Sequence, residues 1–354
     1  MLLGSVKTNS RFSSVDWSSA TLGGKFPRGL LAGGMENGAV FVWNVESLIS
    51  KSSSSPVVAA FTQHASGPVK AVKFNPLNPT QLATGGSDGK VLIVDLKRPE
   101  SIYMPCANNS QQSAQITSLA WNTQVSHILA SAAADGTVSI WDLKSRKAWC
   151  ELRSETAGMA VADIAWNPSQ GLHLLTASAD DRNPVIKLWD LRSSTSMPLA
   201  TLAGHTKGIL SMAWCPHDDQ LLLSCGKDNR TILWDLFSLQ PIADVPNEST
   251  EQPIENTTSQ EMFGAGGLAS SQQRRTDVQW SPVKRGVALT CSLDRKVQAH
   301  SILGLSSKSG RPPKWMRPSS SVSCGFGGAV ISCVSSDKYI RMKTFVEEPE
   351  LESL

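Results

Sequence analysis

The sequence predicts an all-β fold built from tandem repeats, and three observations support this prediction. The chain of 354 residues contains eleven tryptophans but only two tyrosines. Most of the tryptophans end short runs of apolar and β-branched residues, which are typical of strands. Turns rich in Asp, Gly and Asn separate these runs, and the whole pattern recurs along the chain. Length alone leaves two domains open, whereas the recurrence favours one large β domain.

The tryptophans fall into two series with fixed places in the repeat. The first series ends one strand of each unit and consists of Trp17, Trp121, Trp166, Trp214 and Trp280, with Phe74 in the same role. The second series ends a later strand and consists of Trp43, Trp141, Trp189 and Trp234, with Val94 in place of a tryptophan. Positions 43, 94, 141, 189 and 234 lie 51, 47, 48 and 45 residues apart. This spacing indicates WD repeats, whose period of about 40–45 residues is lengthened here by longer loops.

Each unit contains an apolar strand, a tight turn and a second strand, as in ILASAAADGTVSIWDL and LLLSCGKDNRTILWDL. One such sheet cannot bury both of its faces alone, so several sheets are expected to pack radially as a β-propeller. Six units are visible, ending near residues 43, 94, 141, 189, 234 and 300. The sixth is the weakest, because His300 stands where a tryptophan is expected. A polar, Gly-rich insertion at about 246–273 separates it from the fifth unit and is expected to be a disordered surface loop.

The fifth unit brings together His205, Ser224, Asp228 and Trp234. The first three could be mistaken for a catalytic triad. The resemblance to WD repeats implies instead a buried hydrogen-bonded network that ties together the strands of one blade, and this agrees with the need of buried polar groups to be paired. The second unit matches it without the tryptophan, through His64, Thr84 and Asp88.

Composition and motifs argue against several other functions. The 33 basic and 30 acidic residues leave a net charge of +3 without a basic stripe, so nucleic acid is not an expected partner. No apolar run reaches the roughly 18 residues of a membrane span, and the first residues lack a signal-peptide core. Seven cysteines without a C-x-x-C pair are expected to be reduced. We expect a cytoplasmic protein with no metal site, no cofactor and no enzymatic activity.

Four stretches go beyond a generic WD repeat: SHILASAAADGTVSIWDLKSRK, ASADDRNPVIKLWDLR, HTKGILSMAWCPHDDQLLLSCGKDNRTILWDL and the tail RPPKWMRPSSSVSCGFGG at 311–328. Together they resemble the large outer-cage subunit of the COPII vesicle coat. The resemblance extends from about Leu30 to about Phe345. It implies a non-enzymatic scaffold of the outer cage for cargo export from the endoplasmic reticulum to the Golgi. The implied partners are the small six-bladed propeller subunit of the cage, the inner COPII coat and other cage subunits, with peripheral membrane association only through the coat.

The resemblance also implies a division of the chain. Residues 1–310 would form the propeller, 311–346 a Pro-rich linker and a blade donated to the small cage subunit, and 347–354 an acidic tail. Three short strands, SVSCGF, AVISCVSS and YIRMKTFV, would make the donated blade. The residues implied to contact the partner are Trp315, Gly325, Phe326, Gly327, Gly328, Val330, Ile331, Tyr339 and Ile340.

Other interpretations remain open. The tail could close the chain's own ring as a seventh blade, or stay disordered. The family's propeller has seven blades, and its first blade and its C-terminal α-solenoid have no visible counterpart in the sequence. The WDLR stretch, Trp189 to Arg192, resembles the adaptor-binding box of propellers that serve as substrate receptors of cullin-type ubiquitin ligases. A free-standing WD-repeat adaptor is a third possibility.

Overall fold

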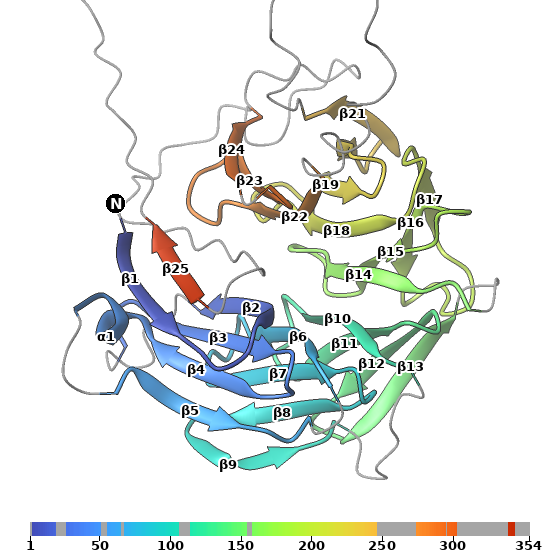
Figure 1. Cartoon of the computed structure of the whole chain (residues 1–354). Helices are drawn as coiled ribbons and strands as arrows, with labels where there is room; N and C mark the ends of the chain where they lie inside the picture. Colours follow the sequence, from blue (N-terminus) through green and yellow to red (C-terminus); the bar gives the residue numbers. More distant parts are fainter. Residues whose placement is uncertain are drawn as a thin grey trace, which may run out of the picture.

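The computed structural model shows an all-β propeller, which confirms the predicted fold class. It describes residues 2–18, 26–50, 55–64, 67–105, 114–153, 158–245, 274–294, 296–302 and 339–343. Six sheets lie around a common centre, and a two-stranded sheet lies at one side of the ring (Figure 1). We number the six sheets as blades 1 to 6 in chain order.

Blades 1 to 3 each contain four strands in sequence order. Blade 1 consists of β2 (Phe12–Ser18), β3 (Leu30–Met35), β4 (Val40–Asn44) and β5 (Val57–Phe61), with the short helix α1 (Val45–Ser50) after β4. Blade 2 consists of β6 (Val69–Phe74), β7 (Gln81–Gly86), β8 (Val91–Asp95) and β9 (Arg98–Tyr103). Blade 3 consists of β10 (Ile116–Trp121), β11 (Ile128–Ala133), β12 (Thr137–Asp142) and β13 (Lys147–Arg153).

Blades 4 and 5 repeat this arrangement, and blade 6 has three described strands. Blade 4 consists of β14 (Val161–Trp166), β15 (His173–Ser178), β16 (Val185–Asp190) and β17 (Ala200–Ala203). Blade 5 consists of β18 (Ile209–Trp214), β19 (Leu221–Gly226), β20 (Thr231–Asp235) and β21 (Gln240–Asp244). Blade 6 consists of β22 (Arg275–Trp280), β23 (Val287–Ser292) and β24 (Val297–Ser301).

The hydrophobic core lies between neighbouring blades, whose faces pack against each other. One cluster joins Leu30 and Val42 of blade 1 to Val69 and Val72 of blade 2, all four with no exposed surface. Blades 2 to 5 each lie between two other blades, so both of their faces are covered, and middle strands such as β7, β11 and β19 are buried along almost their whole length. Burying each such side chain stabilises the fold by about 1.5–3 kcal/mol.

Three tryptophans of the first series link their blade to the one before it, whereas Trp17 and Trp214 donate within their own blade. The indole Nε1 of Trp121 donates to the carbonyl of Lys73 at 2.9 Å, and Trp280 donates to the carbonyl of Ala213 at 2.8 Å. Trp166 makes the same link to blade 3 at 3.1 Å. Since the indole ring is apolar except for this one donor, it can fill the core and still satisfy a backbone carbonyl of the neighbouring blade.

A two-stranded sheet lies between blade 1 and blade 6 (Figure 1). Strand β1 (Leu2–Lys7) pairs with β25 (Tyr339–Lys343) in antiparallel fashion. The sequence analysis predicted β25 within YIRMKTFV but did not predict β1. The insertion 246–273, the segment that includes residues 311–338, and the acidic tail 347–354 lie outside the described residues.

Candidate interaction site

Blade 5 holds the four-residue set of the fifth unit as one chain of hydrogen bonds. His205 Nδ1 lies 3.0 Å from Asp228 Oδ2, and His205 Nε2 lies 2.8 Å from Ser224 Oγ. The indole of Trp234 donates to the same hydroxyl at 2.8 Å. Every polar group is paired if the His205 Nδ1–H donates to the carboxylate and the Ser224 hydroxyl donates to Nε2. Because Ser224 is fully buried and used twice, this arrangement ties strands together and offers no nucleophile to a substrate.

Blade 2 repeats the network without the tryptophan. His64 Nδ1 lies 3.1 Å from Asp88 Oδ1, and its Nε2 lies 2.9 Å from Thr84 Oγ1. Burial lowers the pKa of His64 despite the hydrogen bond and the charge of Asp88, which act in the opposite direction. His64 is therefore neutral at pH 7 and donates a single proton, as the network requires.

Blades 3, 4 and 6 keep only the bond between the ring of the third strand and a hydroxyl of the second strand. Trp141 donates to the Ser131 hydroxyl at 2.8 Å, and Trp189 donates to the Thr176 hydroxyl at 3.0 Å. In blade 6, His300 Nε2 lies 2.9 Å from Thr290 Oγ1. A histidine can thus replace the tryptophan of the second series, because its ring also reaches the hydroxyl of the preceding strand.

The ionised carboxylate of Asp228 makes the folding stability of the chain depend on pH. Although desolvation opposes ionisation, hydrogen bonds from His205 and from the backbone of Thr206 and Arg230 lower the pKa of Asp228 from 3.8 to about 2. A folded-state pKa below the unfolded value means that the stabilisation is fully present above about pH 4. It is lost as the pH falls towards 2. After allowance for solvent screening it is on the order of 1–2 kcal/mol.

We therefore expect Asp228→Asn to be less stable than the natural chain at pH 7, with a difference that shrinks between pH 4 and pH 2. Urea unfolding followed by circular dichroism at several pH values measures this difference. A difference that stays constant over the whole range would contradict the assignment of the acid-sensitive group to Asp228.

A central cavity of about 810 Å³ lies where the innermost strands meet. Its polar side chains connect neighbouring blades: Asp163 Oδ1 accepts from the Ser118 hydroxyl at 2.7 Å, and Asp163 Oδ2 accepts from the Met212 backbone at 2.9 Å. The Ser211 hydroxyl lies 2.7 Å from Asp277 Oδ1 and 3.3 Å from Asp163 Oδ2. These bonds join blades 3, 4, 5 and 6 around the cavity, so the polar lining belongs to the ring's own structure.

The sequence analysis did not predict these polar contacts around the cavity, although the sequence carries a recurring pattern that marks them. Ser14, Ser118, Asp163, Ser211 and Asp277 each stand three residues before a tryptophan of the first series. In all six innermost strands the pairing register shifts just before this place, as in Val161/Asp163 and Ile209/Ser211. A β-bulge re-aims the residue that follows it. The recurring short polar residue at this offset therefore marks a contact to the next blade.

The opposite part of the cavity carries an ion pair. Asp16 Oδ2 accepts from the backbone of Phe74 at 2.7 Å, and its Oδ1 lies 3.6 Å from Lys73 Nζ. Desolvation raises the pKa of Asp16, and the charge of Asp16 in turn raises the pKa of Lys73. The two charges largely compensate each other inside the ring.

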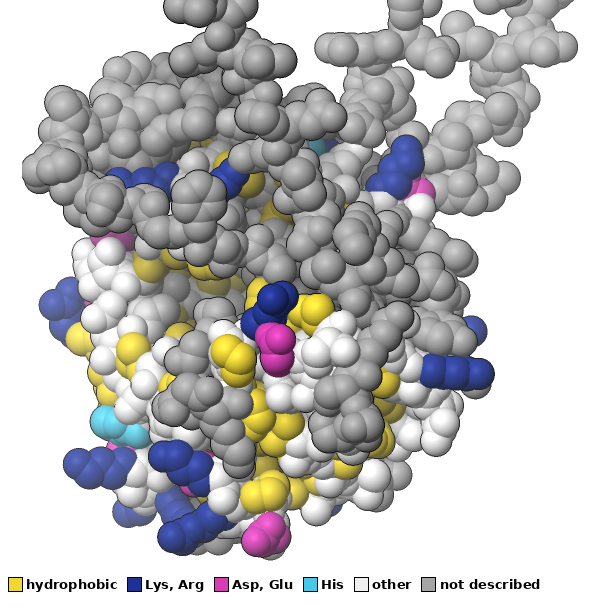
Figure 2. Space-filling view, turned by 90° about the vertical axis from the view of Figure 1, so that its left-hand side faces the viewer, with side chains coloured by type: hydrophobic (Ala, Val, Ile, Leu, Met, Phe, Trp, Pro, Cys, Tyr) yellow, Lys and Arg dark blue, Asp and Glu magenta, His cyan; other side chains and the backbone are white. Residues whose placement is uncertain are grey.

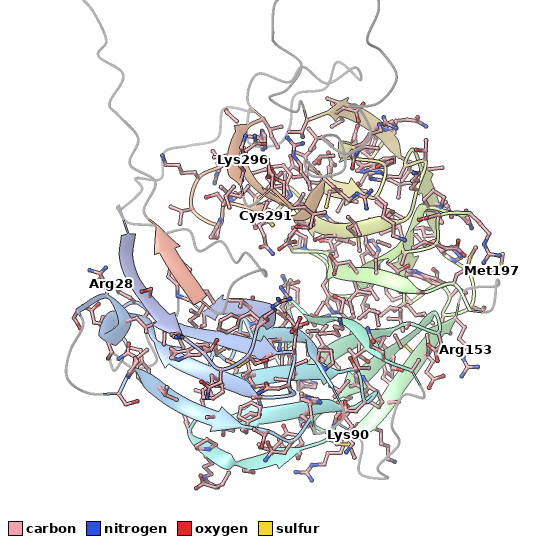
Figure 3. The ribbon with its side chains drawn as sticks, viewed as in Figure 1. Arg28, Lys90, Arg153, Met197, Cys291 and Lys296 are labelled. Carbon is pink, nitrogen blue, oxygen red and sulfur yellow. The ribbon has the colours of Figure 1, made fainter. Side chains whose placement is uncertain are left out.

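The thiol that faces the cavity is not reactive. Cys291 points towards the centre of the ring, whereas Met197 and Arg153 lie at its outer rim (Figure 3). Burial raises the pKa of Cys291 to about 11, which keeps the thiol protonated at pH 7.

Among the described residues, no group of three His, Cys, Asp or Glu side chains could hold a metal ion. In the same part of the chain, no helix is long and apolar enough to cross a membrane.

The WDLR stretch ends its blade in the same way as its counterparts. Asp190 Oδ1 accepts from the backbone of Arg192 at 3.0 Å and lies 3.4 Å from its Nε. The corresponding turns of blades 3 and 5 place the backbone of Lys144 and Phe237 at 2.9 and 3.0 Å from the preceding aspartate. The arginine therefore follows an ordinary turn between the third and fourth strands of a blade.

The two-stranded sheet contains the only described residues of the predicted donor segment. Tyr339 pairs with Lys7, and Ile340 pairs with Val6. The other predicted contact residues, Trp315, Gly325, Phe326, Gly327, Gly328, Val330 and Ile331, lie outside the described residues. In this structure β25 thus pairs with β1, a strand of its own chain.

Strand β1 is anchored to blade 1. Val6 packs against the buried cluster that contains Phe12 and Trp43, and Trp43 stacks on Phe41 with ring centroids 5.7 Å apart. Hydrophobic side chains are visible between the residues drawn in grey on the side of the molecule that Figure 2 shows. The candidate interaction site is the β1–β25 sheet together with blades 1 and 6, which lie on either side of it.

Family models match both halves of the propeller. The model for the Nucleolar protein 10-like N-terminal domain, a β-propeller, matches residues 9–185, and the WD domain, G-beta repeat, matches residues 196–235. A solved structure titled "COPII on membranes, outer coat vertex" superposes with a TM-score of 0.68 at 25% identity, covering 96% of this chain and 85% of that chain.

Curated relatives cover most of the chain. The protein transport protein SEC31 of Mycosarcoma maydis is 33% identical to the chain, in an alignment that covers 99% of the chain. SEC31 of Dictyostelium discoideum is 36% identical, in an alignment that covers 87% of the chain. The chain is 33% identical to Sec31B of Mus musculus over 93% of its length. It spans only about a quarter of these relatives, covering 27%, 23% and 28% of them. The family model over half of the chain shows that it belongs to the β-propellers of the Nucleolar protein 10-like N-terminal type, and its curated relatives show that it is a SEC31-like WD-repeat propeller.

Proposed function

We propose that this chain is a non-enzymatic scaffold of the COPII outer coat, which assembles on the cytosolic face of the endoplasmic reticulum membrane and supports cargo export to the Golgi. The observation that supports this most is the superposition on the outer coat vertex structure, which covers nearly the whole chain. A second structure titled "The structure of the COPII coat assembled on membranes" superposes with the same TM-score of 0.68. The names of the relatives, protein transport protein SEC31, agree with this role.

The chemistry of the described residues fits a scaffold. The histidines and hydroxyls that could suggest catalysis are consumed in hydrogen bonds between strands, and the cavity carboxylates bind neighbouring blades. A rigid ring of this kind presents loops and edges to other proteins. Coats then gain strength from many modest contacts made at once on a membrane surface.

The partner we propose first is the small six-bladed propeller subunit of the cage, with residues 311–346 as the donated blade. An exposed sheet edge on an open propeller is a ready acceptor for extended strands, since main-chain hydrogen bonds supply affinity for any strand of suitable side-chain pattern. The inner COPII coat and other cage subunits are proposed as further partners.

Deletion of residues 311–346 is expected to abolish binding to the small six-bladed subunit of the same organism. The measurement is size-exclusion chromatography of the mixed proteins, with isothermal titration for the affinity. The matched control is deletion of residues 347–354, which lie beyond the proposed donor segment and should leave the one-to-one complex unchanged. If the intact chain forms no complex, the proposed partner is wrong.

The rival role as a ubiquitin-ligase receptor is tested by Arg192→Asp. Because Arg192 follows a turn that blades 3 and 5 share, we expect this variant to change no protein interaction of the chain. A pull-down with a cullin adaptor that depends on Arg192 would favour the rival function.

A further inference from the structure

We propose that β1 is an acceptor strand within the chain that holds the C-terminal strand β25 in the free protein and competes with its donation to a partner. This inference rests on the proposed function, because it concerns how the donated segment is regulated. It predicts two states of one tail: paired with β1 in cis, or added to the partner's sheet in trans.

The position of β1 in the ring supports a role as the outermost strand of a seventh blade. In blades 1 to 5, the outermost strand is followed directly by the innermost strand of the next blade, as β5 is followed by β6. Strand β1 is followed by β2, whose residues line the central cavity as the innermost strand of blade 1. β1 therefore takes the fourth-strand position, and β25, which pairs with it, takes the third.

The sequence around β25 agrees with that position. In blade 3, Asp135 stands two residues before β12 begins at Thr137 and seven residues after β11 begins at Ile128. Asp337 likewise stands two residues before β25 begins at Tyr339, and seven residues after Val330. The spacing of this aspartate before β25 is therefore the one that precedes a third strand in this repeat.

The pairing is specific in register and is anchored on one side. Five Cα pairs join the strands, among them Ser5 with Arg341 and Val6 with Ile340. Val6 also packs against the buried cluster of blade 1, so β1 stays in place when β25 leaves. Because side chains alternate between the faces of a strand, a shift by one residue would turn the buried face of β1 outward.

The competition follows from effective concentration. A strand tethered to its acceptor within one chain has an effective concentration of about millimolar. A partner can therefore remove β25 only if its binding outweighs this intramolecular pairing. The main-chain groups on the edge of β25 that pairs with β1 cannot bond a partner strand on that edge at the same time. Holding β25 in cis therefore weakens the apparent affinity for the partner and covers a sheet edge that could otherwise aggregate.

A reversible crosslink tests this inference in the full chain. Ser5→Cys with Arg341→Cys places two thiols at paired positions, and the Ser5 side chain is exposed, so the substitution disturbs no core contact. The matched control is Ser5→Cys with Ile340→Cys, because residue 340 is one position out of register with residue 5 and successive residues of a strand alternate between the faces of a sheet. Mild oxidation should link residues 5 and 341 but not residues 5 and 340, as peptide mass mapping would show in the presence of the native cysteines.

Binding to the small six-bladed subunit is then measured with the linked and the reduced chain. We expect at least a tenfold loss of affinity in the linked chain and full recovery on reduction. Equal affinity of both forms would overturn the competition while leaving the proposed function intact. Absence of the 5–341 link would overturn the cis pairing. If the reduced chain does not bind either, the proposed partner fails, and the crosslink yield still decides whether β1 holds β25.

Discussion

Replacement of Trp234 by alanine is expected to lower the free energy of unfolding by about 4 kcal/mol. The indole is 1% exposed and packs in the cluster between blades 4 and 5 that contains Leu202 and Met212. It also lies against Gly204, where an added Cβ would stand 2.7 Å from the ring. Truncation would leave a cavity and remove the hydrogen bond to Ser224.

Two comparison variants separate packing from hydrogen bonding. Trp149 lies on the outermost strand of blade 3 and is 50% exposed, so Trp149→Ala should cost about 1 kcal/mol or less. Trp234→Phe keeps most of the apolar ring but lacks the N–H, so its effect should fall between the two. Urea unfolding followed by circular dichroism gives all three values. Equal effects at positions 234 and 149 would show that the blade network does not hold the sheet together.

The blade networks illustrate what a repeat allows one to predict. His205, Ser224, Asp228 and Trp234 stand at fixed places within one unit, and His64, Thr84 and Asp88 recur at the same places. Such residues come together because strands of one hairpin pair locally, as Leu222 does with Trp234. Local pairing brings Ser224 and Trp234 together, whereas the place of His205, which precedes β18, was expected from the resemblance to WD repeats.

Contacts between distant parts of the chain could not be obtained in this way. Strand β1 has the sequence LLGSVK, which is short and carries no repeat marker, and its partner lies more than 300 residues away, at Tyr339–Lys343. The bond from Ser118 to Asp163 joins neighbouring blades and depends on how the bulged innermost strands face each other. The hydrophobic pattern determines which face of a strand is buried, but not which blade lies next to it.

Loss of the Asp163 carboxylate is expected to have the second largest effect. Asp163→Ala removes the acceptor of the Ser118 hydroxyl in blade 3 and of the Met212 backbone N–H in blade 5. Leaving donors at the cavity wall without their partner should lower the free energy of unfolding by about 3 kcal/mol. Ser118→Ala removes only one of these bonds and should cost about 1 kcal/mol. If both variants lost the same amount, the link to blade 5 would contribute nothing.

The charge of the Asp163 side chain affects folding stability separately from its shape, and the variant Asp163→Asn distinguishes the two effects. Desolvation raises the pKa of Asp163 above 3.8, although hydrogen bonds from Met212 and Ser118 act against it. A folded-state pKa above the unfolded value means that this group favours folding at low pH and loses that contribution as the pH rises. The asparagine keeps one acceptor oxygen and does not ionise. Its stability relative to the natural chain should therefore improve between pH 4 and pH 7, and a relative stability that falls over this range would show that the ionised carboxylate is favoured in the ring.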